Sequence, residues 1–141
     1  MNMTDAELRA LCNRFFDAYQ EARIDELDQH VLSKDCIIWT NVFGAKHRDE
    51  NLALIVESQK RHRRRVYNDR IINTFDGGFV IQYTLNVVEH SGRAFPLSVA
   101  IVALCSDGRI TRLDEYIDPT KSPAWQERMA AEKAQKAAAQ G

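Results

Sequence analysis

The sequence predicts an α+β domain whose N-terminal helices pack on a curved, mostly antiparallel sheet and enclose an apolar pocket. Two observations predict this class. Apolar residues recur at steps of three and four in the first part of the chain, as on amphipathic helices, and alternate from residue 66 onward, as on strands. Short turns containing Gly join the alternating segments, so neighbouring strands must run antiparallel. Helices followed by strands are typical of the α+β class.

The first helix is expected to begin after Thr4, because Glu7 stands three positions further on and completes a capping box. Its apolar positions share one face as far as about Ala22. They are Leu8, Leu11, Cys12, Phe15, Phe16 and Tyr19. This face is expected to cover one side of the sheet.

Three further elements are expected before the long strands. A second, short helix begins at Asp25, and residues 36–40 form a short strand because they are rich in β-branched and aromatic side chains. Residues 43–48 form a turn-like passage. Asp49 or Arg48 then opens a third helix, which runs from residue 51 to about residue 64.

Four long strands are predicted at residues 66–75, 79–90, 95–106 and 109–118. Their connectors contain Gly77, Gly92 and Gly108, each in a strong hairpin signal, so the strands form an antiparallel meander. After this meander, Ser122 and Pro123 are typical of a helix start. We therefore expect one domain over residues 1–121 and a helical tail over 122–141, whose Ala-rich end is frayed and solvated.

Composition narrows the function classes. Hydrophobic residues make up 45% of the 141 residues, charged residues 28%, and the net charge is −1, so neither nucleic acid nor an anionic membrane is an expected partner. No apolar run approaches the roughly 18 residues that a membrane-spanning helix needs, and the N-terminus lacks a secretion signal. The three cysteines are widely spaced among apolar residues, which indicates reduced thiols in a cytoplasmic protein without a metal site or cofactor.

A basic run at residues 60–65 leaves two interpretations open. It can bind nucleic acid, phosphate or a carboxylate ligand, or it can be a solvated helix C-terminus, where cations interact favourably with the helix dipole. We favour the second interpretation, because the run lacks interleaved aromatic residues and the chain is slightly acidic. One of its arginines could still gate the pocket or pair with an inward carboxylate.

The faces of the strands predict both a core and a dimer. Alternation places Phe79, Ile81, Tyr83, Leu85 and Val87 on one face. The next strand is apolar on both faces, and a sheet that is apolar on both sides must be covered on both sides. Helices cover one side, so we expect a second copy of the chain to cover the other, in a homodimer formed through the sheet face.

The last strand places a carboxylate among apolar side chains. Thr111, Leu113, Glu115 and Ile117 share a face, and their apolar members set this face inward. Burial of a carboxylate raises its pKa, which suits a general base or acid near neutral pH. The alternative is that Glu115 pairs with an Arg or an amide on a helix and only closes the helix–sheet interface.

This order of elements, with a Trp39-Thr40-Asn41 strand and a closing Gly-Arg-Ile-x-x-x-x-Glu-Tyr-x-Asp stretch at 108–118, resembles the SnoaL-like branch of the nuclear-transport-factor-2-like superfamily. The resemblance implies a cystatin-like, cone-shaped α+β barrel around an apolar pocket, often dimeric. Such proteins include ketosteroid isomerase-like isomerases, polyketide cyclases, dehydratases, epoxide hydrolases and non-catalytic binders, so the fold leaves the function open.

Two familiar mechanisms of this superfamily lack residues here. In the limonene epoxide hydrolase pattern, Trp39 and Asn41 occupy the aromatic-x-Asn positions and Glu115 that of the last Asp, but Tyr83 and Leu85 replace the Arg-x-Asp pair. Because Leu85 cannot transfer a proton, that relay is missing. Ketosteroid isomerases use a carboxylate inside the first strand, whereas Asp35 precedes the strand expected here.

The remaining residues predict a small-molecule site. Glu115 is the candidate base, with Tyr83 and Asn41 as partners that stabilise oxyanion charge. The expected ligand-binding residues are Trp39, Tyr19, Phe15, Leu85, Leu113 and His47, of which His47 is either a second proton shuttle or a surface residue. These residues suit a cofactor-independent isomerase, cyclase, dehydratase or other lyase or hydrolase acting on a small hydrophobic molecule. The alternative is a non-catalytic ligand-binding or dimerisation module of the same fold.

Overall fold

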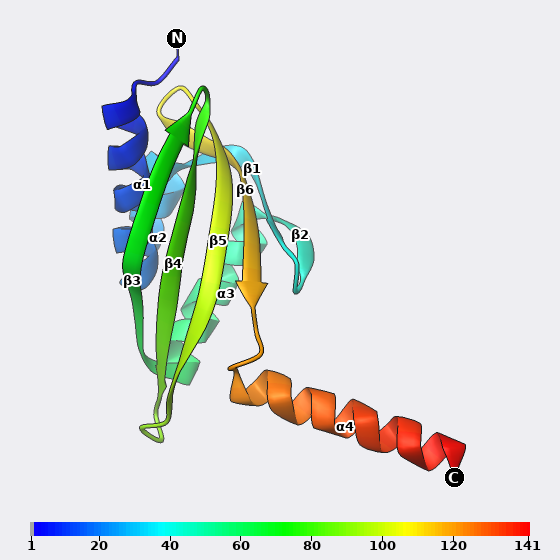
Figure 1. Cartoon of the computed structure of the whole chain (residues 1–141). Coiled ribbons are helices and arrows are strands. Elements are labelled where there is room, and N and C mark those ends of the chain that lie inside the picture. Colours follow the sequence, from blue (N-terminus) through cyan, green and yellow to red (C-terminus); the bar gives the residue numbers. More distant parts are fainter. Residues whose placement is uncertain (1) are drawn as a thin grey trace.

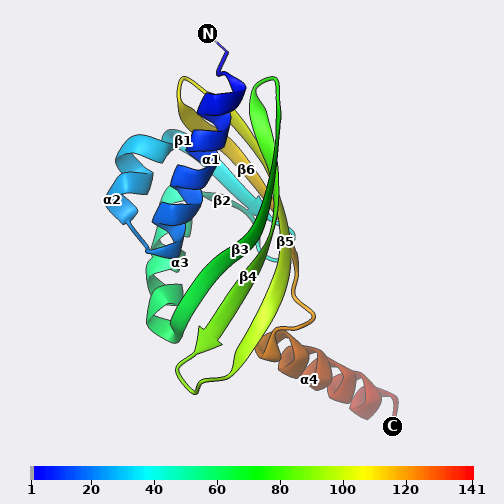
Figure 2. The same cartoon turned by 60° about the vertical axis from the view of Figure 1, so that its left-hand side comes forward.

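The computed structural model describes residues 2–141, and its centre is a curved, open six-stranded sheet in the order β2-β1-β6-β5-β4-β3 (Figure 1). The strands are β1 (Leu32–Thr40), β2 (Gly44–His47), β3 (His62–Phe75), β4 (Gly78–Glu89), β5 (Ala94–Ser106) and β6 (Arg109–Asp118). The helices are α1 (Asp5–Gln20), α2 (Ile24–Glu26), a π-helical turn at Leu27–Val31, α3 (Arg48–Arg61) and α4 (Pro123–Gln140). Helices α1 and α3 cover one face of the sheet, as Figure 2 shows. The predicted α+β class is confirmed.

Helix α1 begins as the sequence predicts. The side chain of Thr4 accepts a hydrogen bond from the backbone N–H of Glu7 at 3.1 Å, which caps the helix. The apolar face points into the core, where Cys12 and Phe16 are almost fully buried. This face, rather than helix propensity alone, holds the helix against the sheet.

The long strands form the predicted meander. β3, β4, β5 and β6 pair antiparallel in sequence order, with boundaries close to the expected ones. At the β5–β6 turn both Asp107 (φ 52°) and Gly108 (φ 76°) adopt left-handed backbone conformations, as a tight hairpin turn requires. Strand β1 runs parallel to β6 and places Thr40 beside Glu115.

Residues 43–65 differ from the expectation. The predicted turn contains a strand, β2, which pairs antiparallel with β1, and its Gly-Ala-Lys-His sequence gives no alternating signal. Helix α3 begins at Arg48, one of the two residues expected to open it, and the side chain of His47 caps it by accepting a hydrogen bond from the backbone N–H of Asp49 at 3.2 Å. It ends at Arg61, because His62 already pairs with Glu89 in the β3–β4 ladder.

The two faces of the sheet are as predicted, with one local correction. Phe79, Ile81 and Leu113 lie in the core beneath the helices. On β6, however, Ile110 rather than Thr111 is buried. A register shift in the β5–β6 ladder at Leu104/Cys105 adds a residue there and changes which side chain faces inward.

Helix α4 projects away from the sheet and none of its residues is buried (Figure 1). Its start is the predicted one, since the side chain of Ser122 accepts a hydrogen bond from the backbone N–H of Trp125 at 3.4 Å. The expected frayed end is wrong: the helix continues to Gln140, in keeping with the high helix propensity of its many alanines. No helix within residues 2–141 is long and apolar enough to span a membrane.

Candidate functional site

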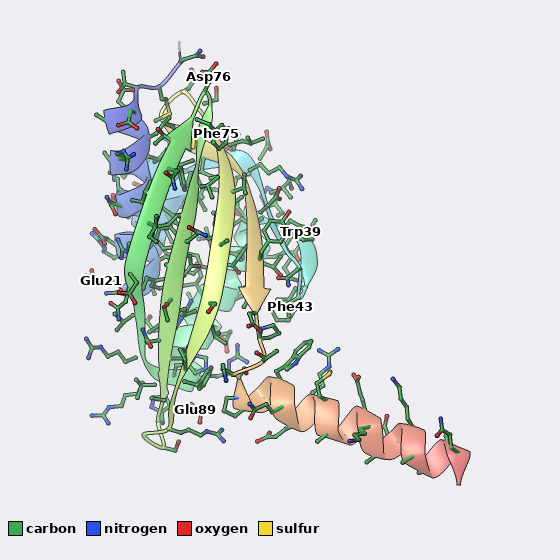
Figure 3. All side chains as sticks on the ribbon, in the orientation of Figure 1. Glu21, Trp39, Phe43, Phe75, Asp76 and Glu89 are labelled. Carbon is green, nitrogen blue, oxygen red and sulfur yellow. The ribbon has the colours of Figure 1, made fainter. Side chains whose placement is uncertain are left out.

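A cavity of about 250 Å³ lies between α3, the end of β1 with the turn after it, and the inner faces of β3 and β6. Its lining residues are Tyr19, Thr40, Phe43, Lys46, Asn51, Leu54, Ile55, Ser58, Arg61, Arg65 and Glu115. Phe43 lies beside the end of β6, at the edge of the sheet (Figure 3). A larger hollow of about 600 Å³ opens on the outer face of the sheet, but the smaller cavity contains the inward carboxyl group.

Glu115 faces this cavity from β6, on the same side as Leu113, as alternation predicts. Burial raises the pKa of Glu115 to about 7, and the charge of Arg65 and a hydrogen bond from Tyr83 only partly oppose this rise. The Tyr83 hydroxyl donates to Oε2 of Glu115 at 3.4 Å. Near neutral pH the carboxyl group is therefore about half protonated, the state in which one group can both accept and donate a proton.

No ion pair within 4.0 Å holds Glu115 among residues 2–141. The expected alternative, in which an Arg or amide on a helix neutralises this carboxylate and closes the interface, is therefore not what the structure shows. Its hydrogen-bond partner is the phenol of Tyr83 on β4, and the charge that acts on it comes from Arg65 on β3.

Three tyrosines surround the carboxyl group. The ring of Tyr67 lies 5.4 Å from that of Tyr83 and 5.9 Å from that of Tyr19, measured between centroids. The Tyr19 hydroxyl donates to Oδ1 of Asn51 on α3 at 3.3 Å. Burial raises the pKa of Tyr19 to about 12 and the pKa values of Tyr67 and Tyr83 well above their usual value. All three phenols therefore stay protonated; those of Tyr19 and Tyr83 donate hydrogen bonds, whereas that of Tyr67 accepts one.

Arg65 completes the cluster. Its guanidinium lies 5.5 Å from the ring centroid of Tyr19 and 5.6 Å from that of Tyr67, in cation–π contact with both. It also donates a hydrogen bond to the Tyr67 hydroxyl. Arg65 belongs to the basic run at 60–65, for which a solvated helix end is the favoured interpretation from sequence and an arginine at the pocket is the open alternative. The structure places Arg65 in the lining of the cavity.

Trp39 and Asn41 do not line the cavity. On β1 the inward side chains are those of Ile38 and Thr40, so Trp39 lies on the outer face, where its ring centroid is 5.1 Å from that of Tyr116 (Figure 3). Asn41 is exposed and bridges to β6: its amide donates to the carbonyl of Ile117 at 3.0 Å and accepts from the Ile117 N–H at 2.9 Å. Asn41 thus extends the parallel β1–β6 pairing.

Of the other residues expected to bind a ligand, one lines the cavity and the rest lie elsewhere. Tyr19 lines the cavity, whereas Phe15 and Leu113 are buried in the core and Leu85 packs against it. His47 has both ring nitrogens engaged, since Nδ1 accepts from the Asp49 N–H and Nε2 lies 3.0 Å from the carbonyl of Lys34.

Thr40 and Asn51 are cavity residues that the sequence did not single out. Thr40 follows Trp39 directly, and alternation along β1 could have identified it once the inner face was known. Asn51 is a buried polar residue on a helix, a kind of position that a sequence pattern does not distinguish. Within residues 2–141 no group of three or more His, Cys, Asp or Glu side chains is arranged to hold a metal ion.

The sequence matches no protein-family model and no curated protein. Three solved structures are similar in fold. A candidate polyketide cyclase from Xanthomonas campestris pv. campestris is 18% identical, with a TM-score of 0.75 over 84% of this chain and 96% of that one. An LEH-like epoxide hydrolase from M. tuberculosis is 20% identical, with a TM-score of 0.71 over 82% and 86%. A candidate isomerase from Bacillus subtilis is 12% identical, with a TM-score of 0.70 over 84% and 91%.

These solved structures share the architecture of this chain, so the fold that the resemblance implies is confirmed. In this chain the architecture is a layer of helices packed on a curved sheet that does not close. At such low sequence identity the likeness concerns architecture, and the chemistry must be argued from this chain's own cavity.

Proposed function

We propose that the protein binds a small hydrophobic molecule in the cavity beside Glu115 and converts it by cofactor-independent acid–base chemistry, as an isomerase, cyclase or dehydratase. The observation that carries the proposal is a carboxyl group with a pKa of about 7 that faces a cavity and has no ion-pair partner within residues 2–141. Perturbed acids in clefts are characteristic of catalytic sites. The cyclase, hydrolase and isomerase names of proteins with the same fold support this reaction class.

In this mechanism ionised Glu115 removes a proton from a carbon next to a carbonyl group of the substrate. The negative charge that develops on the carbonyl oxygen is stabilised by donors that line the cavity, for which the amide N–H groups of Asn51 and the guanidinium of Arg65 are available, while the Tyr19 hydroxyl orients the Asn51 side chain. Protonated Glu115 then returns the proton to another carbon, which is an isomerisation, or to a departing hydroxyl group, which is a dehydration.

Tyr83 has a different role in this proposal from the one that the sequence suggests. Its hydroxyl contacts Glu115, but the residue is not among those that line the cavity. We therefore assign Tyr83 as a positioning residue, which orients the carboxyl group and lowers its pKa. Asn41 holds the end of β1 against β6, and so keeps Thr40 beside Glu115.

Hydrogen–deuterium exchange tests the proposal without knowledge of the natural substrate. A panel of small cyclic and aromatic ketones is incubated with the protein in D₂O, and NMR follows the loss of the protons next to the carbonyl group. The wild-type protein is expected to accelerate exchange of at least one ketone above the buffer rate, and E115Q to bind that ketone without accelerating exchange. Equal exchange rates for wild type and E115Q, with the ketone bound to both, would exclude Glu115 as the base.

An alternative is a non-catalytic module that binds a ligand or forms a dimer. The outer face of the sheet favours dimer formation. Ile71 and Tyr116 are about half exposed there, beside the outer hollow of about 600 Å³. Because large apolar side chains gathered on one face mark an interaction surface, we propose that two copies pair through it. Light scattering is expected to give twice the 16.2 kDa of one chain, and a mass near 16.2 kDa at micromolar concentration would contradict the dimer.

We also propose a cytoplasmic location. Cys12, Cys36 and Cys105 are all free and buried in the structure, as the sequence predicts. Such thiols persist in a reducing compartment.

A further inference from the structure

The cavity beside Glu115 is lined by an excess of positive charge. Lys46, Arg61 and Arg65 contribute three cations, against the single carboxyl group of Glu115 among the lining residues of the described chain. Because the pKa of Glu115 is raised to about 7, that carboxyl group carries only about half a charge at neutral pH. The cavity is therefore positive although the whole chain has a net charge of −1.

These cations are poorly matched by carboxylates of the protein. Lys46 reaches the exposed Glu50 only at 3.9 Å, and within residues 2–141 neither Arg61 nor Arg65 has a carboxylate partner within 4.0 Å. Of the other arginines that are not exposed, two have a carboxylate partner, whereas Arg109 has none within 4.0 Å among residues 2–141. Arg48 pairs with Asp28, and Arg70 lies 3.1 Å from Asp17. Arg65 is thus a half-buried arginine without an ionic partner at a cavity wall.

The surroundings of Arg65 hold its side chain in place. Its guanidinium is in cation–π contact with Tyr19 and Tyr67 and donates one hydrogen bond to the Tyr67 hydroxyl, which leaves its other N–H groups for ligand atoms. Arg65 also lines a second hollow of about 380 Å³, together with His62, Arg63 and Arg64. The side chain therefore stands between the Glu115 cavity and a second, basic hollow.

The cavity lining also has apolar members. Leu54 and Ile55 on α3 and Phe43 after β1 line it, beside the polar Asn51 and Ser58 of the same helix, and Phe43 is 67% exposed at its rim. A ligand that matches both the cations and the apolar residues has an apolar body and one anionic group. Carboxylate is the anion that fits the planar fork of an arginine with two parallel hydrogen bonds.

We infer that the molecule bound in this site is a small hydrophobic carboxylic acid, taken up as its anion, whose carboxylate contacts Arg65 while its apolar body lies against Leu54 and Ile55 beside Glu115. This inference rests on the proposed function and specifies its substrate class. Arg65 is the specificity-determining residue, and Arg61 adds charge at the more exposed side of the cavity.

A matched pair of probes isolates the effect of the ligand's charge on its binding. 2-Naphthoate and 2-naphthamide have the same aromatic body and differ in whether the terminal group is an anion or a neutral amide. Their dissociation constants are measured at pH 7 by isothermal titration calorimetry on the full-length protein. The wild-type protein is expected to bind naphthoate at least tenfold more tightly than naphthamide.

R65Q is expected to reduce this preference to about twofold or less, mainly through weaker binding of naphthoate, whereas R65K retains part of it. The matched control is R63Q, which removes an equal charge from an exposed position of the same strand that does not line the Glu115 cavity. It is expected to keep the preference of the wild type. If circular dichroism shows that R65Q is unfolded, R61Q replaces it. R61Q is expected to reduce the preference for naphthoate only several-fold, because Arg61 is exposed.

Four results would overturn the inference. Equal binding of the two probes to the wild type would remove the charge preference, and an equal loss in R65Q and R63Q would reduce it to a general field effect. Binding of naphthamide without naphthoate would refute the anionic ligand but leave the proposed small-molecule site intact. Failure of both probes to bind would count against that site as well.

Discussion

Replacing Glu115 by glutamine removes a charge from the inner face of the sheet and keeps the size of the side chain. The folded protein holds the Glu115 proton with a pKa of about 7, compared with 4.5 for an ordinary glutamate. Because the folded pKa lies above the unfolded one, this group favours folding fully below pH 4.5, and its contribution is lost as the pH rises through 7. At about 1.4 kcal/mol for each pH unit, the ionised carboxylate costs about 3 kcal/mol of stability.

Above pH 7 the free energy of unfolding of E115Q is therefore expected to be about 3 kcal/mol higher than that of the wild type, so the variant is more stable. The two proteins become similar near pH 4.5, where the wild-type carboxyl group is neutral in the folded state. Urea denaturation followed by circular dichroism, repeated in steps from pH 4.5 to pH 8, measures this difference directly. A corresponding rise of about 10 °C in the melting temperature is expected above pH 7.

A matched control separates this effect from the general loss of a negative charge. D114N changes the neighbouring carboxylate, which lies on the outer face and pairs with Arg112 at 3.0 Å. An exposed ion pair of this kind contributes about 0–1 kcal/mol, so D114N is expected to change stability little. A difference between wild type and E115Q that stays constant from pH 4.5 to pH 8, or a glutamine variant less stable at pH 8, would refute the reasoning. If the expected pH dependence is observed, the chain keeps a carboxylate that lowers its stability, as expected of a functional group.

Three further predictions concern neighbouring residues. Y83F removes the donor to Glu115, so the pH midpoint of ketone exchange should move upward by up to about one unit, and an unchanged midpoint would rule out the positioning role. N41A should lower the free energy of unfolding by about 1–2 kcal/mol through loss of its two bonds to Ile117 while exchange per folded molecule persists, and loss of exchange alone would point to a catalytic amide. I71K should convert the proposed dimer to monomers in light scattering, because it buries a charge at the outer face, and an intact dimer would locate the interface elsewhere.

The parts of the fold that local signals encode were predictable. The β3–β6 meander follows from alternation and from turns whose residues adopt left-handed backbone conformations, such as Gly77 at φ 91° and Gly108 at φ 76°. Alternation also placed Glu115 on the inner face, because its neighbours Leu113 and Ile117 are apolar on one side of the strand. Each of these inferences needs only residues that are close together in the chain.

The β1 strand shows where local signals are insufficient. Ile37, Ile38 and Trp39 are consecutive apolar residues, so alternation alone does not tell which of them face the core. Parallel pairing with β6, opposite Leu113 and Glu115, turns Ile38 and Thr40 inward and Trp39 outward. The orientation of the β1 side chains is thus set by a partner strand more than seventy positions away in sequence.

The inward position of Arg65 also depends on tertiary structure. Counting back from the β3–β4 turn pairs Tyr67 with Asn86, but a bulge between Asn68 and Ile71 shifts its partner to Leu85. Within this bulge Asp69 takes a φ of 56°, which is uncommon for a residue other than Gly. A shift of one residue exchanges the two faces of a strand, and here it directs Arg65 and Tyr67 toward Glu115.

The sequence by itself therefore determined the α+β class, the hairpins and the inward carboxylate, since all three follow from the short periods of helices, strands and turns. The composition of the site around that carboxylate was decided only by the tertiary structure. Which strands pair, in what register and across which bulge depends on contacts between distant segments, and those contacts bring Thr40, Asn51 and Arg65 to Glu115.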